Sequence, residues 1–327
     1  MKERIPQEPP LIEKLPAGPR PVWSVMIPAY NCAEFITRAI EGVLMQDPGA
    51  EHMQIEVVDD ASTDGDLESI VREIGKGRVG YFRQSENQGS LRNFETCLQR
   101  SKGYYIHLLH GDDIVLEGYY EEMEKLFGKF PEIGSAFCMN SYINGAGVET
   151  GRTGKLLESA GIIPDWLEKI STIVYCQPPA VSVKREVYER LGSFYAGFFG
   201  EDWEMWCRIA AHYPVAYSPN CLAQYRTHPN NISTRFNQTG QSLDDIEMFL
   251  GIIQRNLPES KRKQLRDVAI KNFSANFAGV VSRSFNGDPK KFLGMVLRFG
   301  LKKPSKMRTY FLIRLVINYL VHVKNKL

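Results

Sequence analysis

Tyr104-Tyr-Ile-His-Leu-Leu-His-Gly-Asp-Asp113 is a short apolar stretch that ends in a glycine and two adjacent carboxylates. Its composition favours a buried β-strand that stops at the paired acids. Open α/β sheets bind their ligands at the carboxyl ends of the strands, so this strand would bring negative charge to a ligand-binding edge. Adjacent carboxylates repel each other, and a hard cation such as Mg²⁺ or Mn²⁺ relieves the repulsion. The alternative is a solvated Gly-Asp-Asp turn.

Strands and helices alternate on both sides of this stretch. β-favouring apolar runs predict strands over the following residues: 22–27, 55–58, 79–83, 134–139 and 180–184. Helical spacing occurs between them, over residues 35–44, 67–74, 90–99, 117–129, 164–174 and 186–191. The alternation predicts an α/β fold, with a mainly parallel, twisted sheet and helices on both of its faces. From about Leu243 the pattern is helical to the C-terminus.

Polar residues gather where the predicted strands end. The second strand runs into Asp59-Asp60-Ala-Ser-Thr-Asp64-Gly65, and the third precedes a turn at Glu86-Asn87-Gln-Gly89. Glu201 and Asp202 stand at the start of a later helix, where carboxylates are favoured, so a plain capping pair is the alternative to a catalytic one. Neither G-x-G-x-x-G nor G-x-x-x-x-G-K-[ST] occurs, which argues against a dinucleotide-binding fold and a P-loop NTPase.

Two local expectations concern the loops. Asn31 follows the first strand and is expected to cap the helix after it. The glycine-rich stretch 144–154 is expected to be a mobile loop.

Composition places the chain among globular proteins. Its 327 residues are 43% apolar and 24% charged, which is ample material for one large domain or two ordinary ones. Residues 1–20 are polar and rich in proline, and they predict a flexible leader. No signal-peptide segment and no run of 18 apolar residues occurs. Widely spaced cysteines without a zinc pattern predict reduced thiols in a cytoplasmic protein; they are Cys32, Cys97, Cys138, Cys176, Cys207 and Cys221.

The net charge of +2 conceals a marked asymmetry along the chain. Residues 261–327 hold 16 Lys/Arg against two acids, whereas residues 1–260 hold 24 against 36. The apolar segment 309–323 is too short and too basic to span a membrane, and 290–327 therefore predict an interfacial region on anionic lipid, at the inner face of the plasma membrane. The alternative is a helix docked on its own domain or on a second subunit of a homo-oligomer. Nucleic acid is not expected, because no nucleic-acid-binding module accompanies the charge.

Six motifs in order resemble the family 2 glycosyltransferases, which have the GT-A fold. They are Val25-Met-Ile-Pro-Ala-Tyr-Asn31, Val57-Val-Asp-Asp-Ala-Ser-Thr-Asp-Gly65, Asn87-Gln-Gly-Ser-Leu-Arg-Asn93, Gly111-Asp-Asp113, Gly200-Glu-Asp-Trp203 with Trp206-Cys-Arg208, and Tyr225-Arg-Thr-His228. The resemblance covers about residues 22–233 and implies a GT-A catalytic domain over 21–235 that binds a nucleotide-sugar. This domain would lie between the leader over 1–20 and a basic helical region over 236–327.

The resemblance also implies roles for individual residues. Asp202, or Glu201 in its place, would be the general base of an inverting transfer. Asp113 would bind Mn²⁺ or Mg²⁺ at the diphosphate, and Asp112 would hold the ribose or join the metal shell. Arg226 and His228 would contact the diphosphate. Tyr30 would stack on the base of a nucleoside-diphosphate sugar, preferably a UDP-sugar, and Asp60 would accept a hydrogen bond from a ring N–H of that base. The residues that would bind the donor are Pro28, Tyr30, Asn31, Asp60, Asn87, Gly89, Arg92, Asp112, Arg226 and His228.

One position departs from the family pattern. Many relatives carry an acid where this chain has His110, which leaves open whether Asp112 or Asp113 ligates the metal directly. The implied acceptor is a hydroxyl of a saccharide or lipid-linked molecule, in the synthesis of a cell-surface polysaccharide or glycolipid. Two other functions stay open: a non-catalytic subunit that binds nucleotide-sugars, and a sugar-1-phosphate nucleotidylyltransferase. The latter lacks support, because no Gly-rich, Arg/Lys-containing loop follows the first strand.

Overall fold

The computed structural model describes residues 3–229, 231–232, 241–285, 288–300 and 304–324. The chain forms two compact units. Unit 1 comprises Met1–Trp166 and Tyr175–His228, and unit 2 comprises Leu167–Val174 and Pro229–Leu327. The boundary expected at residue 235 falls on residues outside the described ranges. Among the described helices, none is both long and apolar enough to cross a membrane.

The first half of unit 1 is the predicted run of parallel strands. β1 (Trp23–Ala29) pairs in parallel with β2 (Met53–Asp59) on one side and with β4 (Tyr105–Leu108) on the other, and β3 (Gly80–Arg83) extends the sheet beyond β2. Because all four run the same way, the loops after them meet at one edge of the sheet. The motif residues that follow β1, β2 and β4 are thereby brought together.

The second half of unit 1 makes the sheet a mixed one. In the described part of the chain its main order is β3-β2-β1-β4-β9-β6-β10-β5. β9 (Val181–Lys184) is antiparallel to both of its neighbours, whereas β6 (Ser135–Asn144) and β10 (Val215–Thr227) are parallel to each other. Three shorter strands add antiparallel pairs: β5 (Ile114–Val115), β7 (Glu149–Arg152) and β8 (Gly161–Ile162).

The glycine-rich stretch is a hairpin rather than the mobile loop that its composition predicts. β6 and β7 pair across it. Gly147 has a φ of 80°, the left-handed conformation that a tight turn needs, and Asn144 Oδ1 accepts the Val148 N–H at 3.0 Å. Turn chemistry therefore closes a hairpin where the glycine count alone suggests mobility.

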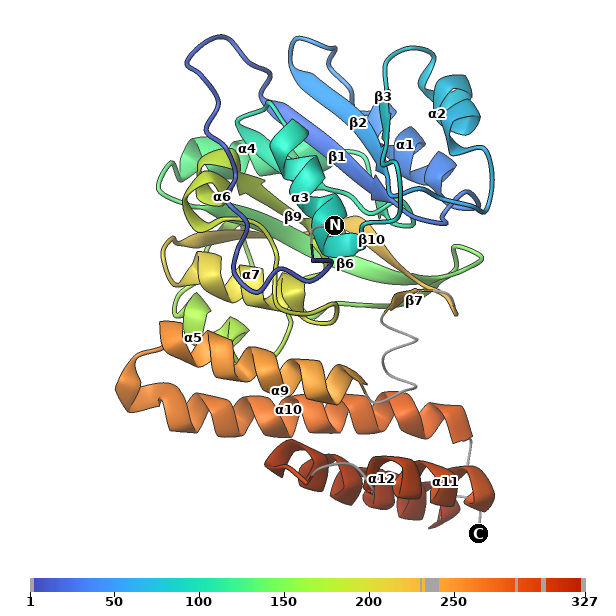
Figure 1. Ribbon diagram of the computed structural model, residues 1–327. Coiled ribbons are helices and arrows are strands. Elements are labelled where there is room, and N and C mark those ends of the chain that lie inside the picture. The colour runs from blue at the N-terminus through green and yellow to red at the C-terminus, as the bar shows by residue number, and fades with distance from the viewer. Residues whose placement is uncertain (1–2, 230, 233–240, 286–287, 301–303, 325–327) are drawn as a thin grey trace. The chain divides into compact units, whose positions relative to one another are not determined.

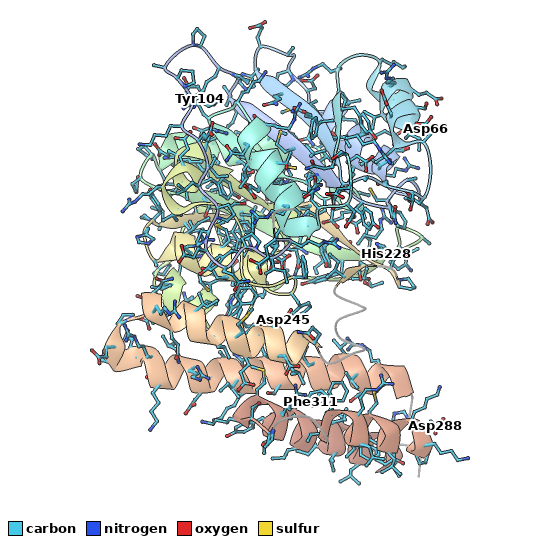
Figure 2. All side chains as sticks on the ribbon, in the orientation of Figure 1. Asp66, Tyr104, His228, Asp245, Asp288 and Phe311 are labelled. Carbon is cyan, nitrogen blue, oxygen red and sulfur yellow. The ribbon has the colours of Figure 1, made fainter. Side chains whose placement is uncertain are left out.

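Helices flank both faces of the sheet, as predicted (Figure 1). α1 and α4 pack against the core that includes Val25 and Ile27 of β1, whereas α3 lies on the opposite face. The helices of this unit are α1 (Ile36–Leu44), α2 (Leu67–Gly75), α3 (Ser90–Arg100), α4 (Tyr119–Lys129), α5 (Trp166–Ile170, shared with unit 2), the short η1 (Pro178–Ala180), α6 (Arg185–Leu191) and α7 (Glu201–Ala210). Asp66 caps α2 by accepting the Ser69 N–H (Figure 2).

Asn31 does not cap α1, and that expectation is wrong. The helix begins at Ile36, and its cap residue Phe35 makes no side-chain capping bond. Asn31 instead has a left-handed φ of 50° and accepts the Thr63 N–H at 2.8 Å. Its amide thus serves the loop after β2, which asparagine allows because it tolerates this backbone conformation.

The leader is more ordered than its composition predicts. Residues 3–20 form no helix or strand, but they run along unit 1 as the dark blue segment of Figure 1. Ile12 is buried, Gln99 donates to the Leu11 carbonyl at 2.8 Å, and Arg185 donates to the Glu13 carbonyl at 2.9 Å. Prolines keep such a segment extended, and its unpaired carbonyls then find donors on α3 and α6.

Unit 2 is helical over its described residues, as predicted. It contains α9 (Gln241–Ile253), η2 (Gln254–Asn256), α10 (Glu259–Phe285), α11 (Pro289–Gly300) and α12 (Lys306–Lys324). Phe311 of α12 is fully buried and lies 4.8 Å, ring to ring, from Phe299 of α11 (Figure 2). Ser274 of α10 donates to the Met307 carbonyl at 3.0 Å. One face of α12 is therefore docked within its own unit.

Candidate active site

The loops after β1 and β2 are joined at the edge of the sheet. Asn31 donates its backbone N–H to Ser62 Oγ at 2.9 Å, in addition to its bond with Thr63. Asp59, at the end of β2, accepts the Ser62 N–H at 2.9 Å and the Tyr81 hydroxyl at 2.7 Å. These bonds fix the path of the chain on either side of Tyr30, whose side chain is 51% exposed at the edge.

Asp60 connects the loop after β2 with the start of α3. Its carboxylate accepts the N–H groups of Gln88 at 2.7 Å and Gly89 at 2.9 Å, and the Asn87 amide reaches its carbonyl at 3.3 Å. Burial raises the pKa of Asp60, and the two N–H donors and the Arg4 charge only partly oppose that effect. Gly89 has a φ of 89°, which favours glycine at this junction.

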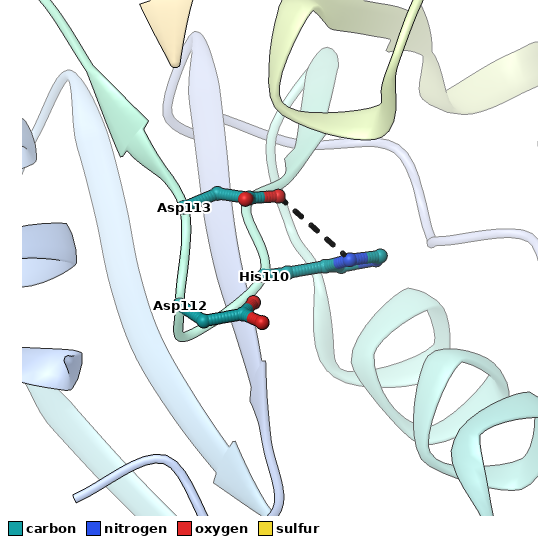
Figure 3. Close-up of side chains that lie close together, drawn as sticks. All are labelled: His110, Asp112 and Asp113. Atoms are coloured by element: carbon teal, nitrogen blue, oxygen red, sulfur yellow. Dashed lines mark ion pairs between the residues drawn. The ribbon is translucent and has the colours of Figure 1, made fainter. Parts of the chain in front are cut away.

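Three ligand-type side chains meet in the loop after β4. His110, Asp112 and Asp113 place one potential ligand atom each within 4.8 Å of one another, and Figure 3 shows all three extending to the same side. The Gly111 N–H bonds to the Pro28 carbonyl at 3.2 Å, which ties this loop to β1. A Cβ at Gly111 would lie 2.6 Å from Cys32 Sγ, so only glycine fits there without a shift.

The surroundings of Asp113 fit a divalent cation. Its side chain is 1% exposed; Oδ1 accepts the Arg226 N–H at 2.8 Å, whereas Oδ2 is buried without a hydrogen-bond partner. His110 Nδ1 lies 4.0 Å from that oxygen. Burial and the Asp112 charge raise the pKa of Asp113 well above its usual range. An orphaned buried oxygen next to a second carboxylate is the donor set that Mg²⁺ and Mn²⁺ prefer.

The end of β10 closes this cluster from the other side. His228 Nε2 lies 3.0 Å from Asp112 Oδ2. The buried Arg226 guanidinium donates to the carbonyls of Asp112 at 2.8 Å, Asn144 at 3.1 Å and Gly145 at 3.2 Å. Arg226 therefore braces two loops, and its contact with a diphosphate stays a prediction.

Asp202 lies at the start of α7, after Gly200, whose φ is 99°. Trp203 and Trp206 bury one side of the helix. Burial raises the pKa of Asp202 to about 6, and the Trp203 N–H, at 2.7 Å from its carboxylate, opposes that shift. A carboxylate that changes protonation state near neutral pH is suited to accept a proton.

A row of aromatic rings connects α7 with the acid cluster. Trp206 lies 6.3 Å from Phe194, Phe194 lies 5.3 Å from Phe94, and Phe94 stacks on His110 at 5.3 Å, each distance joining ring centroids. Segments about one hundred residues apart in the sequence are thereby held in a fixed relation. Two predicted residues remain: Arg92 is paired with Glu95 at 2.6 Å, and Glu201 is the first residue of α7.

Two residues beside the predicted site have a structural role that the sequence did not predict. Asp59 holds the loop after β2, whereas its neighbour Asp60 faces the start of α3. Only the alternation of side chains along a strand could have distinguished the two aspartates in the sequence. Arg4 donates to Asn87 Oδ1, and a Cβ at Gly89 would lie 3.2 Å from Arg4 Nε. No pattern in the polar leader points to that long-range contact.

Known proteins resemble this chain in sequence and in fold. The model of the family described as "Glycosyl transferase family 2" matches residues 24–192. A putative teichuronic acid biosynthesis glycosyltransferase, TuaG of Bacillus subtilis, is 26% identical over 66% of this chain and 82% of its own. An uncharacterized glycosyltransferase of Mycoplasma genitalium, MG025, is 30% identical over 38% of this chain, and the match spans only 41% of that protein.

Solved structures share the fold over nearly the whole chain. S. aureus TarS 1-349, in complex with UDP-GlcNAc, superposes with a TM-score of 0.63 at 14% identity, covering 93% of this chain and 92% of TarS 1-349. The mannosyltransferase PcManGT of Pyrobaculum calidifontis, in complex with GDP-Man and Mn²⁺, gives 0.59 at 19% identity, covering 96% and 91%. The sheet and its flanking helices are thus those of a GT-A glycosyltransferase, and the chain belongs to glycosyl transferase family 2.

Proposed function

We propose that this protein is an inverting, metal-assisted glycosyltransferase that moves a sugar from a UDP-sugar to a hydroxyl group of a saccharide or lipid-linked acceptor, in the synthesis of a cell-surface polysaccharide or glycolipid. The observation that carries the proposal is the buried Oδ2 of Asp113, which accepts no hydrogen bond, beside Asp112 and His110 at the carboxyl edge of the sheet. Such an oxygen is costly to bury unless a ligand completes its surroundings. TarS was solved with UDP-GlcNAc and with UDP, which supports uridine as the base.

The donor would lie along the edge formed by the loops after β1, β2 and β4. Tyr30 is exposed there and available to stack on a base, while Asp60, next to Gln88 and Gly89, would accept its ring N–H. Asp113, with Asp112, would hold Mn²⁺ or Mg²⁺. When bound, such a cation supplies Lewis-acid stabilisation of the charge that develops on the departing diphosphate. PcManGT was solved with Mn²⁺, which supports the choice of metal.

Asp202 would act as the general base. Its ionised carboxylate would take the proton of the acceptor hydroxyl while that oxygen attacks the anomeric carbon. The bond from the anomeric carbon to the diphosphate oxygen breaks on the opposite face, and this single displacement inverts the configuration. Glu201, the preceding residue of α7, is the second candidate for this role.

We also place the activity at the inner face of the plasma membrane, through α11 and α12. While one side of α12 is docked in unit 2, its other side exposes Ile313, Ile317 and Leu320, the last at 60%. Exposed basic side chains accompany these apolar residues: Lys290, Lys291, Arg298, Lys306 and Arg314. A basic apolar surface suits anionic lipid, whereas a second copy of the same surface would bring like charges together.

Nucleotide binding tests the donor and metal sites together. Thermal unfolding is measured with UDP, dTDP and GDP, each with and without Mn²⁺, on the wild type and on Asp113→Asn. Ligand at a hundred times its dissociation constant stabilises the native state by about 2.7 kcal/mol. We expect a Mn²⁺-dependent rise with UDP that Asp113→Asn abolishes. No rise with any nucleotide contradicts the proposal, whereas a rise without sugar transfer to any acceptor favours the non-catalytic binding subunit.

Co-sedimentation with vesicles tests the location. We expect the protein to bind vesicles containing phosphatidylglycerol, to ignore pure phosphatidylcholine and to be released by salt. Leu320→Glu should weaken the binding. Val148→Glu, which changes an equally exposed apolar side chain of unit 1 (60%), should not. Equal binding by all three proteins contradicts a membrane contact through α12.

A further inference from the structure

The N-terminal segment Glu3–Glu13, called the strap below, connects two parts of the site that lie far apart in the sequence. At one end the Glu3 carbonyl accepts Arg92 Nε at 2.8 Å, beside the start of α3. In the middle the carbonyls of Pro6 and Pro10 accept the N–H groups of Ala196 at 2.9 Å and Ser193 at 2.8 Å. The strap therefore spans from the loop that bonds to Asp60 to the loop that leads into α7.

Arg4 is the residue that the strap presents to the predicted donor site. Its guanidinium donates to Asn87 Oδ1 and lies against Gly89, and its positive charge partly opposes the rise that burial causes in the pKa of Asp60. Its side chain is nevertheless exposed, so it is not used to support the core. An exposed cation thus stands where Asp60, Asn87 and Gly89 converge.

The backbone on both sides holds Arg4 in this position. On the N-terminal side, the Glu3 carbonyl is bonded to Arg92. On the C-terminal side, Pro6 is buried and its carbonyl is bonded to Ala196. Ala196 has a φ of 74°, an uncommon conformation for a residue with a side chain, and the bond from the strap is one of the contacts that stabilise it. Ile12 is buried and anchors the C-terminal end of the strap. Arg4 is consequently presented with little freedom of the main chain.

We propose that Arg4 is a donor-binding residue that, together with Asp60, selects the base of the nucleotide. The inference rests on the proposed function, because it takes Asp60 as the acceptor of a ring N–H. An acceptor beside a donor matches a base edge on which N–H stands next to C=O, as in uracil, thymine and guanine. In the same register, cytosine and adenine present a bare ring nitrogen to Asp60 and an amino group to Arg4, so both contacts are mismatched.

Calorimetric titration with Mn²⁺ tests this assignment. UDP and CDP are titrated into the full chain as wild type, Arg4→Ala, Arg4→Lys and Lys14→Ala, the last removing an exposed cation of the leader as the matched control. Losing one hydrogen bond from a charged donor should raise the Kd for UDP about ten- to hundredfold in Arg4→Ala. The preference for UDP over CDP should fall by a similar factor. Arg4→Lys should retain part of both, and Lys14→Ala should match the wild type.

The outcomes separate this inference from the proposed function. If the wild type binds no nucleotide, both fail together. If it binds UDP and Arg4→Ala binds it equally well or more tightly, the donor site stands and only the role of Arg4 is overturned, since tighter binding would make Arg4 an obstruction. Hydrogen exchange at the Ala196 amide gives the remaining control: weaker binding with unchanged exchange supports a direct contact, whereas faster exchange assigns the loss to a displaced strap and overturns it.

Discussion

The pH dependence of sugar transfer is the sharpest test of the assignment of Asp202. A general base works only when it is ionised, so kcat/KM follows the ionised fraction of the group in the free enzyme. Burial raises the pKa of the Asp202 carboxyl to about 6, from an ordinary value of 3.8. We therefore expect the rate to fall as the pH is lowered through 6, where an ordinary surface aspartate would still be fully ionised.

The expected change is large enough to measure. With a pKa of about 6, about nine-tenths of the Asp202 carboxyl is ionised at pH 7 and about one-tenth at pH 5. The rate should thus drop about tenfold over those two pH units. A carboxyl at 3.8 would change the rate by less than about a tenth over the same interval. Asp202→Asn should lower kcat by about 10²- to 10⁴-fold and remove the inflection from any remaining rate.

The assay is initial-rate transfer from a UDP-sugar at saturating Mn²⁺, from pH 4.5 to 8, with UDP binding measured at each pH to separate loss of the donor from loss of the base. Folding is the other control. Because the folded pKa of Asp202 is raised, its ionised form destabilises the native state above about pH 6, and this effect disappears below the pKa of the unfolded chain. Asp202→Asn should therefore unfold no earlier than wild type at pH 7. A rate independent of pH between 5 and 7 refutes the assignment.

Three further perturbations have defined outcomes. Asp113→Asn should remove the Mn²⁺-dependent stabilisation by UDP but keep the fold, since an amide oxygen can still accept the Arg226 N–H; unchanged dependence on Mn²⁺ in the thermal assay would contradict the metal site. Glu204→Leu leaves the buried Arg208 guanidinium without its carboxylate partner at 2.9 Å, and should lower the free energy of unfolding by about 3–5 kcal/mol in urea titrations; Glu121→Leu, which loses only an exposed ion pair, should change it little. Phe311→Ala should destabilise unit 2 by about 3–5 kcal/mol, measured as earlier loss of its helical signal. Ile313 is exposed on the same helix, so an equal loss in Ile313→Ala would contradict the assignment of Phe311 to the packed face.

The elements that sequence predicts well here are those with a strong local period. β1, β2 and β4 are short apolar runs that stop at polar loops, and a parallel arrangement of such strands fixes which loops meet. That is why the convergence of Asp60 and Asp113 at one edge could be expected from order alone. The helices of unit 2 were equally readable, because their apolar positions recur at helical spacing.

The elements that escaped prediction depend on long-range pairing. β10 is a thirteen-residue strand, yet its register against β6 shifts on both sides of Cys221, and such irregularities break the alternation by which a strand is read. The strap has no period at all; its carbonyls are satisfied by donors from residues about ninety to one hundred and ninety positions away. Local composition therefore predicts disorder at a segment whose order is supplied by the rest of the fold.

The acid cluster and the strap differ in how firmly the fold holds them. The acid cluster rests on the rigid ends of β4 and β10, joined by the bonds from Arg226 to Asp113 and to the Asp112 carbonyl. The strap, which would bound the base end of the proposed donor site, is held in contrast by hydrogen bonds and one buried isoleucine. Such segments open at a lower free energy than core strands do. A nucleotide that contacts Arg4 should consequently slow hydrogen exchange along the strap more than anywhere in the sheet, which makes exchange at Ala196 a reporter of donor binding that needs no acceptor.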